Sequence, residues 1–343
     1  MKLKGINYDI GIQFFYGNPE SINNVWDKEI FKRELAIIRD ELGCNAIRLS
    51  GTDEDDMICG TEMVLQAGMD CWVSPHYIDA PLDELERRTK AVAAGAEPLR
   101  AKYPNNEVVF IYGCELQHFS PFLPGNNFGE RLALIMTPEW PKLLAEATEK
   151  LGKFFEKVIP GIREVFGGRV TYTTVTLEPI DWTPFDIVGL DAYKNTNTIP
   201  AFMKDLKSYK KIADEQNKEF YCLETGYGCF AECRDVAGAN NMSLDLTPEG
   251  VLNRVAVRDE KAQADALVDA MEDILSVGAC GIFPFTFING KLTHSEDPLH
   301  DLDMIGYSIV KTYEDGRAGS VFEGVNWDPK EVFYALKEFY KTH

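Results

Sequence analysis

The sequence predicts an α/β protein that folds as a single (β/α)8 barrel, or TIM barrel, over residues 1–343. Its length is sufficient, because such a barrel typically needs about 250 residues and often carries insertions. Short apolar segments alternate with longer amphipathic segments along the whole chain, which is typical of parallel strands joined by helices. The chain lacks the glycine-rich phosphate-binding motifs that accompany many open parallel sheets, so a closed barrel is favoured.

Each element follows from its local pattern. Eight short apolar runs are predicted as strands, at residues 4–8, 45–50, 71–75, 108–112, 169–175, 187–192, 219–223 and 281–285. Apolar residues at helical spacing predict helices at residues 28–42, 82–103, 140–166 with an interruption near Pro160, 199–216 and 259–277. A closing helix is expected over residues 329–341, with Asp328 as its N-cap and Pro329 at its first position. Long loops are expected at residues 228–250 and 288–324, after strands 7 and 8, on the face where barrel enzymes hold their active sites.

Charge and cysteine content limit the partners and the compartment. The chain has 55 acidic and 35 basic residues and a formal net charge of -20, which disfavours nucleic acid and anionic membranes as partners. No segment reads as a signal peptide or a membrane span, and the eight cysteines are scattered, several of them within apolar runs. We therefore expect a cytoplasmic protein with reduced thiols. The sequence predicts no cofactor and no metal site, and it leaves the oligomeric state open.

Two glutamates stand where predicted strands end. Glu115 follows strand 4 after Cys114, and Glu224 directly follows strand 7. Strands 4 and 7 lie on opposite sides of an eight-stranded barrel, so the two carboxylates can face each other across a substrate. A retaining glycosidase uses such a pair with its carboxyl groups about 5 to 5.5 Å apart. Glu115 and Glu224 are therefore the candidate catalytic residues.

These positions resemble the clan of retaining glycoside hydrolases that carry the acid/base on strand 4 and the nucleophile on strand 7. The resemblance covers nearly the whole chain and includes Arg48 in AIRLSG, His76 in VSPHY, Tyr193 in GLDAY and the Glu224-Thr225-Gly226 run. Residues 260–264 and 329–337 match the start of helix 7 and the closing helix of the clan. The sequence is also similar to sequences labelled abortive-infection proteins, a name that describes a phage-defence phenotype.

The resemblance implies roles for these residues. Arg48 and Tyr193 would contact the nucleophile, Glu115 would be the acid/base, and His76 would lie in the site. The sequence departs from the clan at two places: Cys114 replaces an asparagine that contacts the sugar 2-hydroxyl, and Phe285 (or Phe287) replaces a tryptophan under the sugar ring. These departures predict a small or modified glycoside as the substrate.

Neighbouring residues supply further candidates. Gln117 or His76 could meet the 2-hydroxyl in place of the lost asparagine, and His118 could tune the proton of Glu115. The best aromatic platforms for a sugar are Trp182 and Tyr227, which adjoin the loops after strands 5 and 7. Further carboxylates occur near strand ends, and some could bind substrate hydroxyls; they are Asp53, Asp79, Glu178 and Asp191.

Two other function classes stay open. The first is a catalytically inactive barrel that binds a glycan or a partner protein, as the abortive-infection label would allow. The second is a lyase or aldolase, which would need a lysine at a strand end to form a Schiff base, and Lys194 comes nearest to that place. Covalent labelling of Glu224, binding without labelling, and borohydride trapping would distinguish the three.

Overall fold

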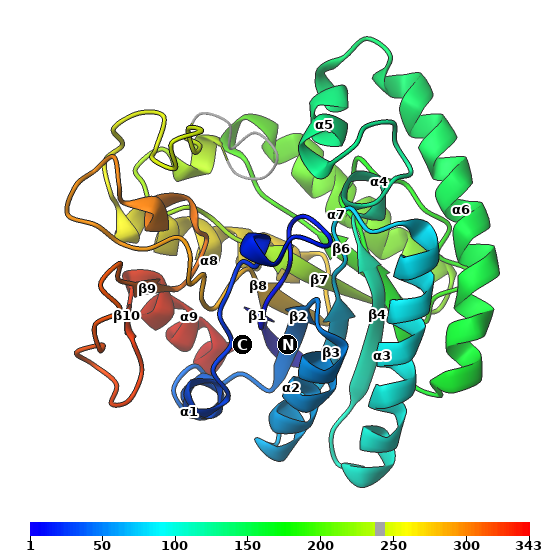
Figure 1. Cartoon of the computed structure of the whole chain (residues 1–343), viewed down its shortest axis with the longest axis horizontal. Helices are drawn as coiled ribbons and strands as arrows, with labels where there is room; N and C mark the ends of the chain where they lie inside the picture. The colour runs from blue at the N-terminus through cyan, green and yellow to red at the C-terminus, as the bar shows by residue number, and fades with distance from the viewer. Residues whose placement is uncertain (237–243) are drawn as a thin grey trace.

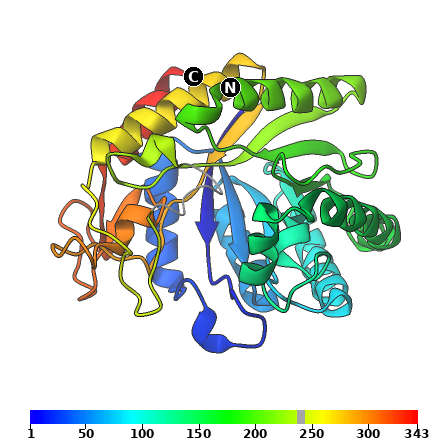
Figure 2. The same cartoon turned by 90° about the horizontal axis from the view of Figure 1, so that it is seen from above.

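Eight parallel strands form the centre of the molecule, and helices surround them (Figures 1 and 2). The computed structural model describes residues 1–236 and 244–343. The strands are β1 (Leu3–Asp9), β2 (Ala46–Gly51), β3 (Asp70–Pro75), β4 (Val108–Cys114), β5 (Val170–Thr173), β6 (Ile187–Asp191), β7 (Glu219–Thr225) and β8 (Gly281–Pro284). They pair in the order β5-β4-β3-β2-β1-β8-β7-β6, and a parallel bridge between Thr174 and Leu190 joins β5 to β6. The predicted (β/α)8 barrel is confirmed.

The helices lie in the segments that connect the strands and at the end of the chain. They are α1 (Lys28–Asp40), α2 (Glu54–Gln66), α3 (Leu82–Lys102), α4 (Leu116–Phe119), α5 (Phe128–Ala133), α6 (Trp140–Val165), α7 (Ile199–Glu215), α8 (Glu260–Ser276) and α9 (Glu331–Thr342). Short 3-10 turns occur as η1 (Pro19–Ser21), η2 (Leu134–Met136), η3 (Thr196–Thr198), η4 (Cys233–Asp235) and η6 (Leu302–Ile305). The loop predicted after strand 8 contains a small antiparallel pair, β9 (Val310–Thr312) with β10 (Trp327–Pro329). Of the loop predicted at 228–250, residues 237–243 lie outside the described residues.

Helix α2 was not predicted from the sequence. Its first turn is acidic, and its buried face mixes large and small residues, so the apolar pattern is weak. Asp53 nevertheless caps it, because its side chain accepts a hydrogen bond from the backbone N–H of Asp56. The helix forms through this cap and through its packing against the barrel.

The predicted interruption of the long helix near Pro160 is wrong. Helix α6 runs without a break from Trp140 to Val165, with Pro160 inside it. Val158, Ile159 and Ile162 are buried around the proline, whereas Pro160 itself is exposed. Burial of this apolar face offsets the backbone hydrogen bond that a proline cannot make.

The predicted start of the closing helix is also wrong. Pro329 belongs to strand β10, and α9 begins at Glu331 with Lys330 as its N-cap residue. Asp328 does not cap the helix; its carboxylate accepts hydrogen bonds from Ser320 and Tyr313 instead. The fully buried Lys330 pairs with Asp303 at 3.0 Å, and this ion pair fixes the chain in an extended form just before the helix.

Apolar side chains fill the interior of the barrel, so the barrel has no open channel. They are Leu3, Ala46, Trp72, Val109, Ile111, Ile187, Tyr221, Leu223 and Phe283. A ligand therefore reaches only the residues at the carboxyl ends of the strands, as in other barrels of this type. None of the described helices is long and apolar enough to cross a membrane. All eight cysteines are free thiols.

Candidate active site

Glu224 is held by two donors at the end of β7. Arg48 donates from Nη1 to its Oε1 at 2.7 Å, and the Tyr193 hydroxyl donates to its Oε2 at 2.8 Å. The Cys114 thiol lies 3.7 Å from the same Oε1. Both oxygens are thus directed by fixed partners, and only 9 % of the residue is exposed. The structure places Arg48 and Tyr193 against Glu224, where the sequence resemblance expects them.

Arg48 is the buried cation of the site. It is only 1 % exposed, and its Nη1 contacts Glu224 and lies 3.7 Å from Asp191 Oδ1. Burial disfavours its charge, but the neighbouring Glu224, Cys114 and Asp191 hold its pKa above the ordinary value. A permanent positive charge therefore stands between two carboxylates.

Glu115 follows β4 in an uncommon backbone conformation. Its φ of 45° lies in the left-handed region, which side chains other than glycine rarely adopt. Such strained positions persist where the surrounding structure fixes them, often at functional sites. None of the described residues donates a hydrogen bond to its carboxyl group. Burial, and then the negative charges of Asp191, Glu224 and Glu178, raise its pKa well above the ordinary value.

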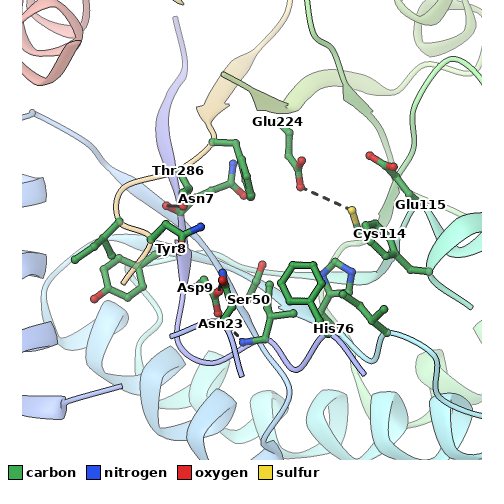
Figure 3. A pocket seen from close by; sticks show the side chains of 17 residues that line it. Asn7, Tyr8, Asp9, Asn23, Ser50, His76, Cys114, Glu115, Glu224 and Thr286 are labelled. Atoms are coloured by element: carbon green, nitrogen blue, oxygen red, sulfur yellow. Dashed lines mark hydrogen bonds between the residues drawn. The ribbon is translucent and has the colours of Figure 1, made fainter. Parts of the chain in front are cut away.

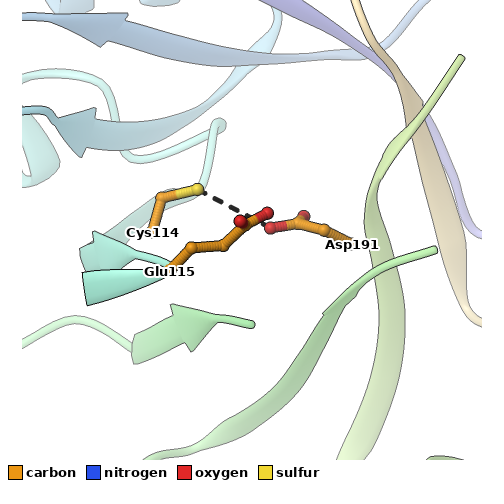
Figure 4. A group of neighbouring side chains, drawn as sticks. All are labelled: Cys114, Glu115 and Asp191. Atoms are coloured by element: carbon orange, nitrogen blue, oxygen red, sulfur yellow. Dashed lines mark hydrogen bonds between the residues drawn. The ribbon is translucent and has the colours of Figure 1, made fainter. Parts of the chain in front are cut away.

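Of the four further strand-end carboxylates named from the sequence, Asp191 is the one that lies beside Glu115 and Arg48. It ends β6, is 2 % exposed, and accepts hydrogen bonds from Thr173 Oγ1 at 2.6 Å and from the Cys114 thiol at 3.6 Å. Figure 4 shows its carboxylate beside that of Glu115. Asp191 and Tyr193 are two positions apart, so they point to the same side of an extended chain, and this spacing could have distinguished Asp191 from the other three carboxylates. Its pKa is raised by burial and by Glu224.

Three potential metal ligands meet here. The ligand atoms of Cys114, Glu115 and Asp191 all lie within 4.8 Å of one another. A thiol must lose its proton to bind a metal, yet burial and the nearby carboxylates raise the pKa of Cys114 well above the ordinary value. The charge of Arg48, 3.7 Å from Asp191, opposes a second cation at the same place. The arrangement favours proton transfer over metal binding.

A pocket of about 660 Å³, its open mouth included, lies beside the two glutamates (Figure 3). Its walls come from strand ends and loops on the carboxyl face of the barrel. The lining residues are Asn7, Tyr8, Asp9, Ile12, Phe14, Asn23, Ser50, His76, Ile78, Cys114, Glu115, Phe119, Glu224, Phe285, Thr286, Ile288 and Asn289. The structure thus brings both predicted glutamates, His76, Cys114 and Phe285 to one cavity.

His76 offers this pocket a neutral imidazole. It is 8 % exposed, packs edge-on against Phe119 at 4.9 Å between ring centroids, and its Nε2 has no hydrogen-bond partner. Burial and the charge of Arg48 lower its pKa to about 3. At neutral pH the ring is uncharged. It can therefore donate a hydrogen bond to a ligand hydroxyl, or accept one from it, without adding charge to the pocket.

Six predicted site residues do not line the pocket. Arg48 and Tyr193 contact Glu224 from behind it, whereas the other four do not reach the site. Trp182, predicted as a sugar platform, is 2 % exposed and packs against Phe185 and against Tyr209 of α7, within the helical layer. The hydroxyl of Tyr227 donates to the backbone of Lys194. These two aromatic side chains are therefore part of the packing and are not available as platforms.

Gln117 and His118 also turn away from the pocket. Both belong to α4; the amide of Gln117 donates to Thr148, and His118 stacks on Trp140. His118 is 3 % exposed, so it is not a surface residue, and burial lowers its pKa to about 4. The short α4 turns these side chains toward α6, so neither contacts the carboxyl group of Glu115.

Lys194 does not provide the amine of a Schiff-base enzyme. Its Nζ pairs with Asp269 at 2.7 Å and with Asp273 at 2.6 Å, both on α8. These carboxylates outweigh burial and raise its pKa, whereas a nucleophilic lysine needs a lowered one. It also does not line the pocket. The structure therefore gives the lyase or aldolase alternative no support.

Comparisons with known proteins give structural matches only. No protein-family model and no curated protein matches the chain. A GH113 β-1,4-mannanase matches with a TM-score of 0.62 at 14 % identity, over 100 % of this chain and 99 % of that one. The GH113 β-mannanase of Alicyclobacillus acidocaldarius matches with a TM-score of 0.60 at 10 % identity, over 99 % and 97 %. A β-glucuronidase of Ruminococcus gnavus matches with a TM-score of 0.58 at 11 % identity, over 99 % of this chain and 50 % of that one.

At these identities the matches establish a shared fold. The chain has the barrel found in these glycoside hydrolases, as the sequence resemblance expects. The similarity to abortive-infection proteins is not among these findings and stays a prediction.

Proposed function

We propose that the protein is a retaining glycoside hydrolase that cleaves a small glycoside by double displacement. The observation that supports this most strongly is the contrast between its two glutamates. Glu224 is fixed by Arg48 and Tyr193, as an ionised nucleophile requires, whereas burial and neighbouring anions favour the protonated form of Glu115. Such a contrast assigns the nucleophile and the acid of a carboxylate pair.

In the first step, a Glu224 oxygen bonds to the anomeric carbon while the glycosidic C–O bond breaks. Glu115 gives its proton to the departing oxygen, so the aglycone leaves as a neutral alcohol. The product is a glycosyl ester of Glu224. In the second step, a water gives a proton to Glu115 and its oxygen bonds to the anomeric carbon. The ester bond breaks, and both glutamates return to their starting states.

A mechanism-based label tests this assignment. A panel of activated 2-fluoroglycosides is incubated with the enzyme, and the intact mass and the labelled peptide are determined. We expect one adduct, on Glu224, and none in Glu224→Gln. Glu115→Gln should slow the cleavage of glycosides with poor leaving groups far more than that of activated ones, which need little acid assistance. Equal losses on both substrate types would remove Glu115 from the role of acid.

The mechanism also predicts the stereochemistry. Proton NMR of the first sugar product should show the anomeric configuration of the substrate. Inversion would contradict double displacement and would indicate that a water occupies the space between the two carboxyl groups.

A binding function without hydrolysis is the second candidate, and Cys114 is the observation that favours it. Its thiol faces Asp191 and Glu224, at 3.6 and 3.7 Å, in the place where the resembling clan has an asparagine for the sugar. A thiol is a weak donor and acceptor, so a contact to the substrate 2-hydroxyl is weakened at this position. Binding of glycosides without any adduct on Glu224 would support this candidate and reject the hydrolase.

A further inference from the structure

Most polar groups of the pocket already bond within the protein. Asp9 accepts hydrogen bonds from the backbone of Gly11 and Ile12 and from the side chain of Asn23. The Asn7 amide donates to the backbone of β7 and β8, and the Thr286 hydroxyl donates to the carbonyl of Asn7. A long sugar chain needs many free donors and acceptors, and this part of the pocket offers few of them.

Two groups left for a ligand lie at the catalytic end, and the hydroxyl of Ser50, on another side of the pocket, adds a third. Among the described residues, His76 Nε2 has no hydrogen-bond partner, and the carboxyl group of Glu115 faces the same pocket. Together with Glu224, these groups match the hydroxyls of about one sugar ring. Figure 3 shows both glutamates on one side of the pocket and Asp9, Asn23 and Ser50 on another.

Apolar side chains form the rest of the wall. They come from four separate connections and are Ile12, Phe14, Ile78, Phe119, Phe285 and Ile288. Two of the aromatic rings are held by their neighbours: Phe119 stacks on Phe128 at 4.7 Å, and Phe285 packs edge-on against Tyr307. Phe14 is 37 % exposed at the pocket. Such a wall stabilises an apolar group in proportion to the area it removes from water.

The charges of the pocket are one-sided. Among the described residues that line it there is no lysine or arginine, whereas the carboxyl groups of Asp9 and Glu224 are present. The buried Arg48 is already paired with Glu224. A ligand carboxylate would therefore meet negative charge without a counter-charge.

We propose that the pocket takes a monosaccharide glycoside with an uncharged, apolar aglycone, which packs on Phe14, Phe119 and Phe285. The sugar ring meets His76 and the two glutamates. This inference rests on the proposed glycosidase function and adds the substrate class. It also distinguishes the enzyme from one that acts along a polysaccharide chain.

Matched alkyl glycosides test the aglycone. Methyl and octyl glycosides of the sugar selected by the labelling panel have leaving groups of nearly equal acidity, so they differ mainly in apolar surface. We expect kcat/KM to be at least about tenfold higher for the octyl glycoside, since each buried methylene contributes substantially. A glycoside of 8-hydroxyoctanoate, with a terminal carboxylate, should lose most of this preference. Equal values for methyl and octyl glycosides would overturn the proposal.

A pair of variants locates the preference. Phe14→Ala should reduce the octyl-to-methyl ratio several-fold, because it removes a wall of the pocket. Phe15→Ala is the matched control: Phe15 lies in the same loop, is 48 % exposed, and does not line the pocket, so the ratio should stay at the wild-type value. Equal effects of the two substitutions would contradict the assigned wall.

Calorimetric binding of the same two glycosides separates failure of this proposal from failure of the proposed function. Tighter binding of the octyl glycoside, without cleavage or labelling, would reject the proposed hydrolase function and support the proposed apolar binding site. Cleavage of both glycosides, with no preference for octyl over methyl in either assay, would support the hydrolase and reject the apolar aglycone.

Discussion

Removal of the buried cation Arg48 should destabilise the protein more than removal of either carboxylate that it contacts, Glu224 or Asp191. Arg48 is 1 % exposed, and its Nη1 lies 2.7 Å from Glu224 and 3.7 Å from Asp191. Arg48→Met removes the positive charge and leaves both carboxyl groups buried without it. Breaking a buried ion pair in this way costs about 3 to 5 kcal/mol of unfolding free energy. Glu224→Gln should lower the unfolding free energy clearly less. Arg48 still lies beside Asp191, and it can still donate a hydrogen bond to the new amide oxygen.

A double-mutant cycle measures the interaction. The unfolding free energy is determined by urea denaturation at pH 7 for the wild type, Arg48→Met, Glu224→Gln and the double variant, with equal m-values as the test of comparability. Contacting charged groups are expected to show a coupling energy of about 1 to 3 kcal/mol. Lys210→Met is the surface control: Lys210 pairs with Asp214 on an exposed face of α7, so its loss should leave stability nearly unchanged.

Additive effects of the two site variants, within about 0.5 kcal/mol, would refute this reasoning. They would mean that the charge of Arg48 is balanced by groups other than Glu224. Destabilisation by Arg48→Met no larger than that by the Lys210 control would refute the burial of the ion pair itself.

Three further predictions concern two glycines, a buried carboxyl group and the site histidine. Gly226→Ala places a Cβ 2.1 Å from the carbonyl oxygen of Phe285, so it should destabilise by about 1 to 3 kcal/mol and lower the melting temperature. Gly152→Ala is the control, because a Cβ at this position of α6 meets nothing within 4 Å, and it should raise stability by about 0.5 to 1 kcal/mol. Equal melting temperatures of the two variants would contradict the close contact of Gly226 with Phe285. Burial raises the pKa of Glu34 from 4.5 to about 7, so the folded state retains a proton that the unfolded state loses above pH 4.5. Stability should therefore fall between about pH 4.5 and 7, by up to about 3 kcal/mol, and Glu34→Gln should flatten this part of the urea-derived stability profile; an unchanged slope would assign the effect to other groups. His76 has a pKa of about 3, so His76→Ala should lower kcat/KM for the labelling-panel glycosides without moving any limb of the pH–rate profile between pH 5 and 8, and a moved limb would show that the imidazole titrates there.

The sequence by itself determined the barrel and the two candidate glutamates. Strand and helix periodicities are local, and the order of alternating elements leaves few possible topologies. A glutamate that directly follows a buried parallel strand must stand at the carboxyl face of the barrel, which is why Glu115 and Glu224 could be named from sequence. Arg48 and Tyr193 followed from resemblance, and their contacts with Glu224 are seen in the structure.

Details at the ends of elements were less predictable. Pro160 and Pro329 carry a local signal to break or to begin a helix, yet Pro160 lies inside α6 and Pro329 lies in β10. In both places packing outweighs the local preference: an apolar face around Pro160, and the buried pair of Lys330 with Asp303 after Pro329. Local propensity is a weak guide wherever tertiary contacts exceed it.

Only the tertiary structure decided which strand-end carboxylate joins the site. In the sequence, Asp53, Asp79, Glu178 and Asp191 are equivalent candidates. In the structure, Asp53 caps α2, Asp79 pairs with Arg131, and Glu178 bonds to Tyr172, whereas Asp191 lies beside Glu115 and Arg48. The direction of each side chain depends on partners far away in the chain.

The same reason applies to the aromatic residues. Trp182 is the larger and more obvious sugar platform in the sequence, but it packs against α7, and Phe14 and Phe119 line the pocket instead. A loop that follows a barrel strand can turn toward the mouth or toward the helical layer, and both choices bury apolar surface. The choice is made by long-range packing, so the apolar wall of the pocket becomes visible only when the loops are placed together around the two glutamates.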